Sequence, residues 1–171
     1  SYMFVTGPNV VKTVTHEEVS AEELGGASTH SSKSGVTHFS CENEVATLNS
    51  LKTVLSYIPQ NCEDELPVKE YKASDEKRMH LDEIIPESAS QPYDIKEVIN
   101  GVIDEGSFCE VQKDFAGNIV VGFGRLAGKS IGIVANQPAY LAGVLDIDAS
   151  KKAARFVRFC DAFNIPLLVF E

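Results

Sequence analysis

The sequence lacks the features that would place it among membrane-spanning proteins. No apolar run reaches the roughly 18 residues that a transmembrane helix needs, and no basic-then-apolar signal opens the chain. The hydrophobic share of 43% and the charged share of 23% are typical of an ordinary globular protein. We therefore expect a folded protein of 171 residues without a membrane segment, and the opening Ser1 suggests a mature or trimmed start.

Cysteine pairs at metal-binding spacing are also absent. The four cysteines contain no C-x-x-C pair, and the four histidines show neither an H-x-x-x-H nor an E-x-x-H pattern. These spacings argue against a zinc site and against a dense disulfide framework. We expect reduced thiols, no metal, and a cytosol or an organelle matrix as the compartment.

Positive charge is scarce, because the net charge is −10, and this disfavours nucleic acid and anionic membranes as partners. The segment from Lys113 to Phe163 is an exception, with seven Lys or Arg against four Asp and a net charge of +3. Such a segment could hold a phosphorylated ligand. It could equally be a basic helix face that meets solvent or a partner subunit.

Motifs for covalent catalysis and nucleotide binding are missing as well. The sequence has no G-x-S-x-G elbow, and the Gly-rich stretch from Gly25 lacks the Lys-Ser/Thr of a phosphate loop. The Gly122-x-Gly124 pair lies between strand residues and does not open a helix, so it is no dinucleotide fingerprint. A hydrolase triad and a Rossmann site are therefore not expected.

The hydrophobic periodicity predicts alternating strands and helices, and hence an α/β protein. Residues 61–91 carry prolines and charges without sustained periodicity, so we predict a linker there, with some helix around residues 76–84, between units at 1–60 and 92–171. In the first unit we expect a strand at residues 1–5, a helix from Pro8, a helix capped by Ser20 and Glu23, a strand at 35–39 and a helix over 45–58. In the second unit we expect a helix capped by Asp94, a short strand at 108–112, strands at 118–126 and 130–135 joined by the turn Ala127-Gly128, a helix from Ser150 and a strand at 167–170.

The loop from Asn136 to Asp148 is the most informative stretch. It follows a strongly apolar strand and contains a small Ala142-Gly143 step, which would let a ligand approach backbone N–H groups. Such donors stabilise an enolate or another oxyanion without an acidic or basic side chain. The alternative is an ordinary strand-to-helix loop that uses Gly143 for a turn, with Asp148 or Ser150 as the cap of the next helix.

Several stretches resemble one family closely. The segments Ala135–Pro138, Leu141–Ser150 and Lys152–Pro166 resemble the carboxyltransferase (beta) subunits of propionyl-CoA carboxylase and its relatives. Thr6–Val11 with Leu24–Ala27, and Pro92-Tyr93-Asp94 further along, fit the same family, so the resemblance covers essentially the whole chain.

The resemblance implies a crotonase-like fold that the family's full subunit uses twice, with this chain as an interior piece covering the end of one copy and the start of the second. It implies transfer of a carboxyl group between carboxybiotin and the α-carbon of an acyl-CoA, with both oxyanions held by backbone N–H groups. The implied partners are a biotin carboxylase, a biotin carrier that holds the cofactor, and further copies in a homo-oligomer, a hexamer by resemblance. The implied compartment is bacterial cytoplasm, or the mitochondrial matrix in a eukaryote.

The resemblance also selects candidate site residues. We expect backbone donors at Ala142 and Gly143. We expect acyl-CoA or biotin contacts from Asn118, Arg125, Asn136, Gln137, Pro138, Leu141, Ala142, Gly143, Val144, Asp146 and Asp148.

The departures from the family pattern qualify these expectations. The Gly-Gly-Ala-Arg, Pro-Gly-Phe-Leu-Pro-Gly and Gly-Gly-Ala-Tyr stretches of the family are absent, so we expect this chain alone to be inactive. Two other interpretations stay open: a biotin-dependent acyl-CoA decarboxylase of a sodium pump, and a non-catalytic CoA-binding or assembly module.

Overall fold

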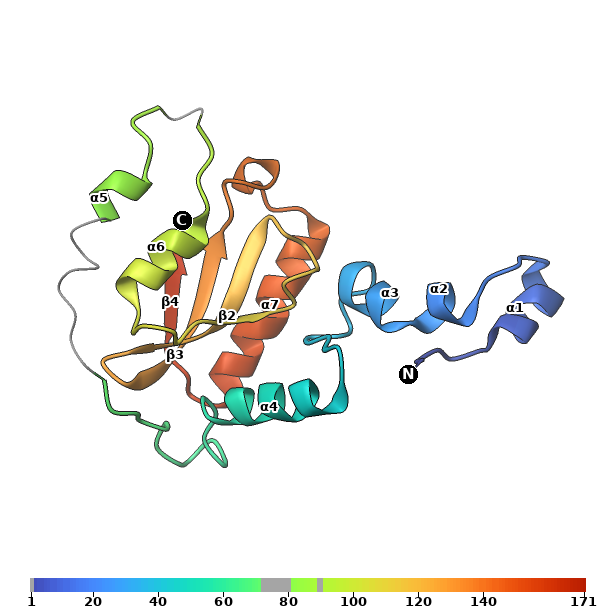
Figure 1. The fold of residues 1–171 in the computed structure, drawn as a ribbon, viewed down its shortest axis with the longest axis horizontal. Helices are drawn as coiled ribbons and strands as arrows, with labels where there is room; N and C mark the ends of the chain where they lie inside the picture. The colour runs from blue at the N-terminus through green and yellow to red at the C-terminus, as the bar shows by residue number, and fades with distance from the viewer. Residues whose placement is uncertain (1, 72–80, 89–90) are drawn as a thin grey trace.

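The computed structural model describes residues 2–71, 81–88 and 91–171, which form a sheet-centred body and a projecting N-terminal arm (Figure 1). The arm and the helix that follows it consist of α1 (Pro8–Thr15), α2 (Ala21–Gly25), α3 (Ala27–Ser32) and α4 (Glu44–Leu55). The other helices are α5 (Leu81–Ile84), α6 (Ile95–Val102), the 3-10 turn η2 (Leu141–Gly143) and α7 (Ile147–Ala162). The strands are β1 (Cys109–Val111), β2 (Ile119–Leu126), β3 (Lys129–Asn136) and β4 (Leu167–Phe170).

The four strands form one mixed sheet in the order β1-β2-β3-β4. The first three run antiparallel, and α7 connects β3 to β4 as a parallel neighbour. The predicted tight turn between β2 and β3 is confirmed, with φ of 51° at Ala127 and 79° at Gly128. The Asp104 carboxylate accepts from both turn N–H groups, at 3.0 and 2.7 Å, and so stabilises this left-handed turn.

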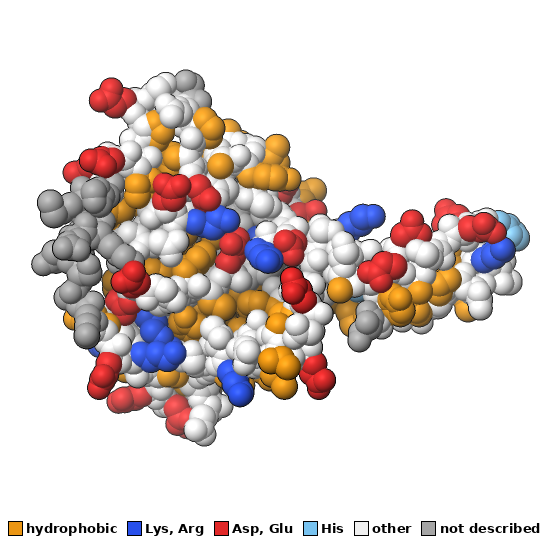
Figure 2. Space-filling model, viewed as in Figure 1, with side chains coloured by type: hydrophobic (Ala, Val, Ile, Leu, Met, Phe, Trp, Pro, Cys, Tyr) orange, Lys and Arg blue, Asp and Glu red, His pale blue; other side chains and the backbone are white. Residues whose placement is uncertain are grey.

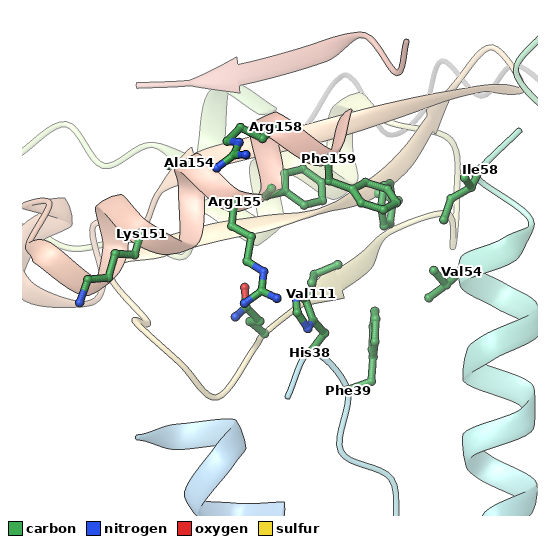
Figure 3. Close-up of a pocket in the computed structure, with 13 residues that line it drawn as sticks. His38, Phe39, Val54, Ile58, Val111, Lys151, Ala154, Arg155, Arg158 and Phe159 are labelled. Carbon is green, nitrogen blue, oxygen red and sulfur yellow. The ribbon is translucent and has the colours of Figure 1, made fainter. Parts of the chain in front are cut away.

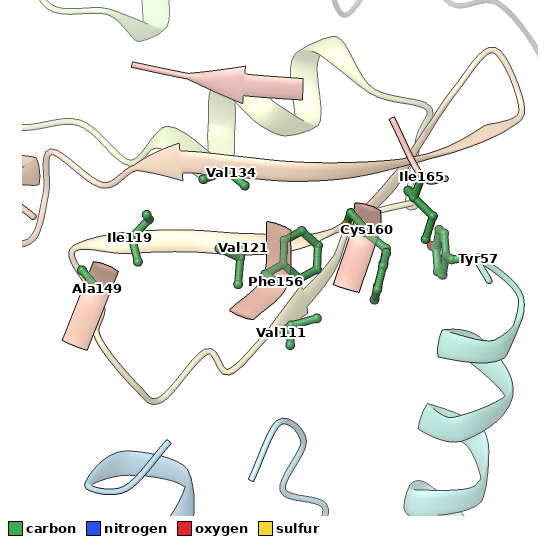
Figure 4. Packing of buried hydrophobic residues seen from close by; sticks show 10 residues of the cluster. Tyr57, Val111, Ile119, Val121, Val134, Ala149, Phe156, Cys160 and Ile165 are labelled. Carbon is green, nitrogen blue, oxygen red and sulfur yellow. The ribbon is translucent and has the colours of Figure 1, made fainter. Parts of the chain in front are cut away.

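Helices cover both faces of the β2–β3 hairpin. Ile95 and Ile99 of α6 pack on one face with Val120 of β2. The other face packs Val121 against Phe156 of α7 (Figure 4). Neighbouring residues of β2 thus point to opposite helices, as the strand period of two requires. The continuous apolar run that predicted this strand is explained by burial on both faces.

Helix α7 begins earlier than the sequence predicts. The expected start was Ser150, with Asp148 or Ser150 as the cap, whereas the helix begins at Ile147 and its cap is Asp146. The Asp146 carboxylate accepts from the Ala149 N–H at 2.8 Å. Asp148 already lies in the first turn, where its carboxylate pairs with Lys151 at 3.5 Å.

Two predicted strands in the first unit are wrong. Tyr2–Val5 is exposed, and its one backbone hydrogen bond within the described parts of the chain joins Met3 N to Gly25 O at 2.8 Å. Residues 35–39 form a bent segment, and its His38 carbonyl accepts from the N–H of Gln112, the residue after β1, at 3.0 Å. Alternation alone does not make a strand when no neighbouring strand is available.

The helix signals in this half were more reliable. The Ser20–Glu23 capping box forms as predicted, and α4 occupies most of the expected 45–58 helix. The predicted helix around residues 76–84 is seen as α5, Leu81–Ile84, and residues 76–80 lie outside the described residues. Within the described ranges, no helix is long and apolar enough to cross a membrane.

Arg125 ties the segment after α4 to the hairpin. Its guanidinium is 3% exposed and lies 4.5 Å above the Tyr57 ring. It donates to the Ser56 carbonyl at 2.6 Å and to the Pro67 carbonyl at 3.0 Å. The planar fork of an arginine can reach both carbonyls at once, so one side chain fixes a connection that is 58 to 69 residues distant in sequence.

This geometry predicts that Arg125→Met lowers the free energy of unfolding by about 3 kcal/mol, because several buried carbonyls lose their donor. Urea titration followed by circular dichroism measures the change. The matched control is Arg158→Met, since Arg158 is exposed and makes no hydrogen bond or ion pair with the described residues. Equal effects of the two substitutions would contradict the role assigned to Arg125.

Candidate functional site

The loop between β3 and α7 lies at the carboxyl end of β3, beside the carboxyl end of the parallel strand β4. Ligands of open α/β sheets bind at such ends, because loops there can converge without obstructing the sheet. The structure therefore places the predicted Asn136–Asp148 loop where a site is expected.

Three amide side chains hold this loop in shape. Asn118 donates from Nδ2 to the Val144 carbonyl at 2.7 Å, and Asn136 donates to the Gly143 carbonyl at 2.8 Å. Gln137 accepts from the Ile95 N–H at 3.2 Å, which attaches the loop to the start of α6. These predicted site residues thus gather at the loop, and their amides are used to shape it.

The turn η2 has an unusual backbone. Leu141, Ala142 and Gly143 follow one another with φ of 49°, 51° and 71°. Glycine adopts this left-handed region freely, whereas Leu141 and Ala142 each have an unfavourable conformation that costs about 1–2 kcal/mol. Strained residues persist where the surroundings impose them, and they concentrate at functional sites.

The strained turn leaves two consecutive backbone donors without acceptors. The Gly143 N–H donates to the Tyr140 carbonyl at 3.0 Å, so this predicted donor is already used in a hydrogen bond within the loop. The N–H groups of Leu141 and Ala142 have no acceptor in the part of the chain that the structure describes. Ala142 therefore stays a candidate donor, and Leu141 joins it in place of Gly143.

A second consequence of the fold is an exposed apolar ridge along the loop. Leu141, Val144 and Ile147 are 62%, 66% and 74% exposed, and Tyr140 and Leu145 continue the ridge. Exposed apolar side chains in a cluster mark contact with a ligand or another protein surface. Leu141 and Val144 are among the predicted contacts, whereas the ridge as a whole follows no strand or helix period.

A polar pocket of about 390 Å³ lies next to the loop. Gln137 and Tyr140 form its loop side, and the Tyr140 ring lies close to Gly117, where a Cβ would come within 3.2 Å of it. Lys96 and Glu110 form an ion pair of 3.5 Å in the opposite wall. The pocket thus places charged groups beside the loop residues Gln137 and Tyr140.

The two predicted carboxylates contribute differently. Hydrogen bonds from the Ala149 backbone and the Asn118 side chain lower the pKa of Asp146, which therefore stays ionised as the cap of α7. Asp148 faces solvent beside Lys151. The Oδ1 of Asn118 is buried without a donor among the described residues. An unsatisfied buried acceptor is unfavourable, which again marks this end of the sheet as specialised.

Arg125 is not brought to the loop. It lies seven residues from Asn118 along the extended strand β2, a separation of about 23 Å. Its guanidinium donates to backbone carbonyls at the opposite end of the hairpin. Pro138, the remaining predicted contact, is half-buried at the loop's start.

A larger cavity lies elsewhere, with a volume of about 920 Å³ (Figure 3). It lies between α7, α4 and the 35–39 segment, with Phe159 in its apolar lining and Lys151, Arg155 and Arg158 around it. Burial, and secondarily the charge of Arg155, lowers the pKa of His38 in its wall. Its walls come from distant segments, so no local sequence signal could reveal it.

Positive and negative side chains are interspersed on the visible face of the body (Figure 2). The basic segment found in the sequence is divided: Arg125 and Lys152 are buried, whereas Arg155 and Arg158 lie at the large cavity. Among the described residues, no cluster of three or more His, Cys, Asp or Glu could hold a metal ion.

Known proteins resemble this chain over nearly its full length. The propionyl-CoA carboxylase carboxyltransferase subunit of Haloferax mediterranei is 58% identical over 99% of the chain. The mitochondrial propionyl-CoA carboxylase beta chain of Homo sapiens is 49% identical over 99% of the chain. The chain spans only 33% and 32% of these two relatives.

Solved structures agree. A transcarboxylase 12S structure, a hexamer with methylmalonyl-coenzyme A and methylmalonic acid bound, superposes with a TM-score of 0.95 at 45% identity. The match covers 98% of this chain and 32% of that one. A single-chain long-chain acyl-CoA carboxylase, at 24% identity and a TM-score of 0.80, shares the fold over 99% of this chain and 17% of its own. The model of the carboxyl transferase domain family matches residues 1–171, and the chain belongs to that family.

Proposed function

We propose that the protein containing this chain transfers a carboxyl group between carboxybiotin and the α-carbon of a short acyl-CoA of the propionyl type. The observation that carries this proposal is the family match over the whole chain, together with relatives named propionyl-CoA carboxylase. The methylmalonyl-coenzyme A bound in the transcarboxylase 12S structure is the carboxylated form of such a substrate, which supports the same class.

The chemistry requires a site that stabilises an oxyanion. Removing the α-proton of a thioester places negative charge on its carbonyl oxygen, and fixed N–H donors lower the energy of that charge. The free N–H groups of Leu141 and Ala142 are such donors, and the apolar ridge lies beside them. These donors suit either the thioester oxygen or the ureido oxygen of biotin.

Biotin fits the surroundings of the loop, because its uncharged ureido ring needs hydrogen-bond donors and an apolar wall. Leu141 and Val144 supply apolar surface, and the left-handed turn supplies N–H groups. When bound, biotin supplies the carboxyl group, and a partner subunit would carry it. Leu141, Ala142 and Val144 would then orient the ring, while Asn118 and Asn136 hold the loop against it.

The assembly that we propose contains a biotin carrier, a biotin carboxylase and further copies of the chain, in bacterial cytoplasm or a mitochondrial matrix. The hexameric transcarboxylase 12S structure supports the homo-oligomer. We also propose that the fold is crotonase-like, with residues 1–60 from one copy, 61–91 as linker and 92–171 from a second copy. The sheet of β1 to β4, with α6 and α7 on its two faces, supports the assignment of residues 92–171 to one α/β unit.

Label transfer tests the function. The full-length protein should move labelled carboxyl groups from carboxybiotin to propionyl-CoA. An acyl-CoA without an α-hydrogen is the control, because it cannot form an enolate and should stay unlabelled. Absence of label in propionyl-CoA, with binding of the thioester intact, would show that the proposed reaction is wrong.

The backbone donors can be tested with a pair of matched substitutions. Ala142→Val should reduce kcat/KM about 100-fold, because a β-branched side chain disfavours φ of 51° and moves the N–H. Ala127 also has φ of 51° but lies in the distant β2–β3 turn, so Ala127→Val imposes similar strain away from the loop.

Both variants should lose about 1–2 kcal/mol of stability, measured by denaturant titration, and only Ala142→Val should lose activity. A similar loss of activity in Ala127→Val would attribute the effect to general destabilisation.

A further inference from the structure

Lys152 is a buried cation that the chemistry above does not use. It is 2% exposed, although lysine is almost never fully buried without a partner. None of the ion pairs of the described residues includes it. Its Nζ donates instead to three backbone carbonyls, those of Phe115 at 2.7 Å, Ile119 at 2.9 Å and Ala116 at 3.3 Å.

These carbonyls belong to the tight turn before β2 and to Ile119, the first residue of that strand. Ala116 has φ of 45°, and the Ile119 N–H donates to the Ala116 carbonyl at 3.2 Å. The geometry turns three carbonyl oxygens toward one point, where they would repel one another without a donor. A single ammonium has three N–H groups and satisfies all of them.

The same turn contains Asn118, which is hydrogen-bonded to the candidate loop. The Asn118 side chain donates to Val144 O at 2.7 Å, near the end of the loop, and its main-chain carbonyl accepts from Gln137 N at 3.0 Å, near the start. Lys152 itself is on α7, whose cap Asp146 ends the loop. Contacts therefore connect α7 to the turn before β2, and the turn to both ends of the loop.

We propose that Lys152 is a positioning residue for the Asn136–Asp148 loop, because its ammonium fixes the turn from which Asn118 holds the loop at both ends. The link to carboxyl transfer rests on the proposed function. The ordering of the loop by Lys152 does not depend on the proposed function.

The charge of Lys152 makes this device sensitive to pH. Burial lowers the pKa of Lys152 from 10.5 to about 8; Glu110 of β1 and Asp114 after it oppose this shift, and Lys96 of α6 adds to it. A neutral amine has only two N–H groups, so deprotonation removes one of the three hydrogen bonds that hold these carbonyls. Loop order should decline as pH rises through about 8.

The contribution of Lys152 to the free energy of unfolding should change in the opposite direction from loop order. Because the pKa in the folded state lies below that of the unfolded chain, the unfolded state binds more protons between about 8 and 10.5. The contribution of Lys152 to the free energy of unfolding therefore rises with pH in this window. A merely structural role for Lys152 would give the same rise in its contribution to stability but leave loop order unchanged.

Hydrogen–deuterium exchange of the full-length protein, corrected for the intrinsic pH dependence of exchange, tests the proposal. Protection of the Gly143 and Val144 amides, which are hydrogen-bonded within the loop, should fall about fivefold between pH 7 and 9.5, as one hydrogen bond is lost. Lys152→Arg should abolish this fall, because arginine stays charged throughout the range. Lys151→Gln is the matched control, since the Lys151 side chain is 71% exposed, and it should keep the wild-type profile.

Thermal unfolding of the same samples shows whether each variant is folded. If arginine does not fit the site, the wild-type profile decides alone. Two results would overturn the proposal. One is loop protection in the wild type that does not change with pH. The other is loop protection that falls together with the contribution of Lys152 to stability, which is measured by comparison with Lys152→Gln. A pH-dependent loop without label transfer would refute only the proposed function, whereas label transfer with a pH-independent loop would refute only the role of Lys152.

Discussion

Burial of the β2–β3 hairpin on both faces is the constraint on which the rest of the structure depends. Apolar side chains of α6 and α7 cover alternate residues of β2, so polar chemistry is confined to the hairpin's ends. At one end Arg125 secures the segment after α4. At the other end, Asn118 and Asn136 shape the loop where backbone donors are free.

Both buried cations are stabilised in the same uncommon way. Arg125 and Lys152 donate to backbone carbonyls, with no carboxylate partner among the residues described. Each joins segments that no regular secondary structure connects. Their charge is therefore used for internal architecture, which removes two of the seven cations of the basic segment from the surface.

Local patterns predicted the body of the protein well, and long-range partners explain most of what they missed. The hairpin, its Ala127-Gly128 turn and the Asn136–Asp148 loop follow from short apolar runs and turn residues, and the family resemblance is confirmed. The 35–39 strand failed because strand formation depends on a neighbour. The contacts of Arg125 with Ser56 and Pro67 lie too far apart in sequence to be read from spacing. The left-handed conformation of Leu141 and Ala142 leaves no compositional signal, because neither residue type favours it.

The free donors of the strained turn belong to the main chain, and this has a consequence for inhibition. A point substitution at Leu141 replaces a side chain but leaves an N–H in place, except where proline is introduced. A small molecule that engages the Leu141 and Ala142 amides would thus contact atoms that most codon changes cannot remove. Resistance to such a compound would have to arise by reshaping the backbone, at the expense of the conformation that the proposed reaction needs.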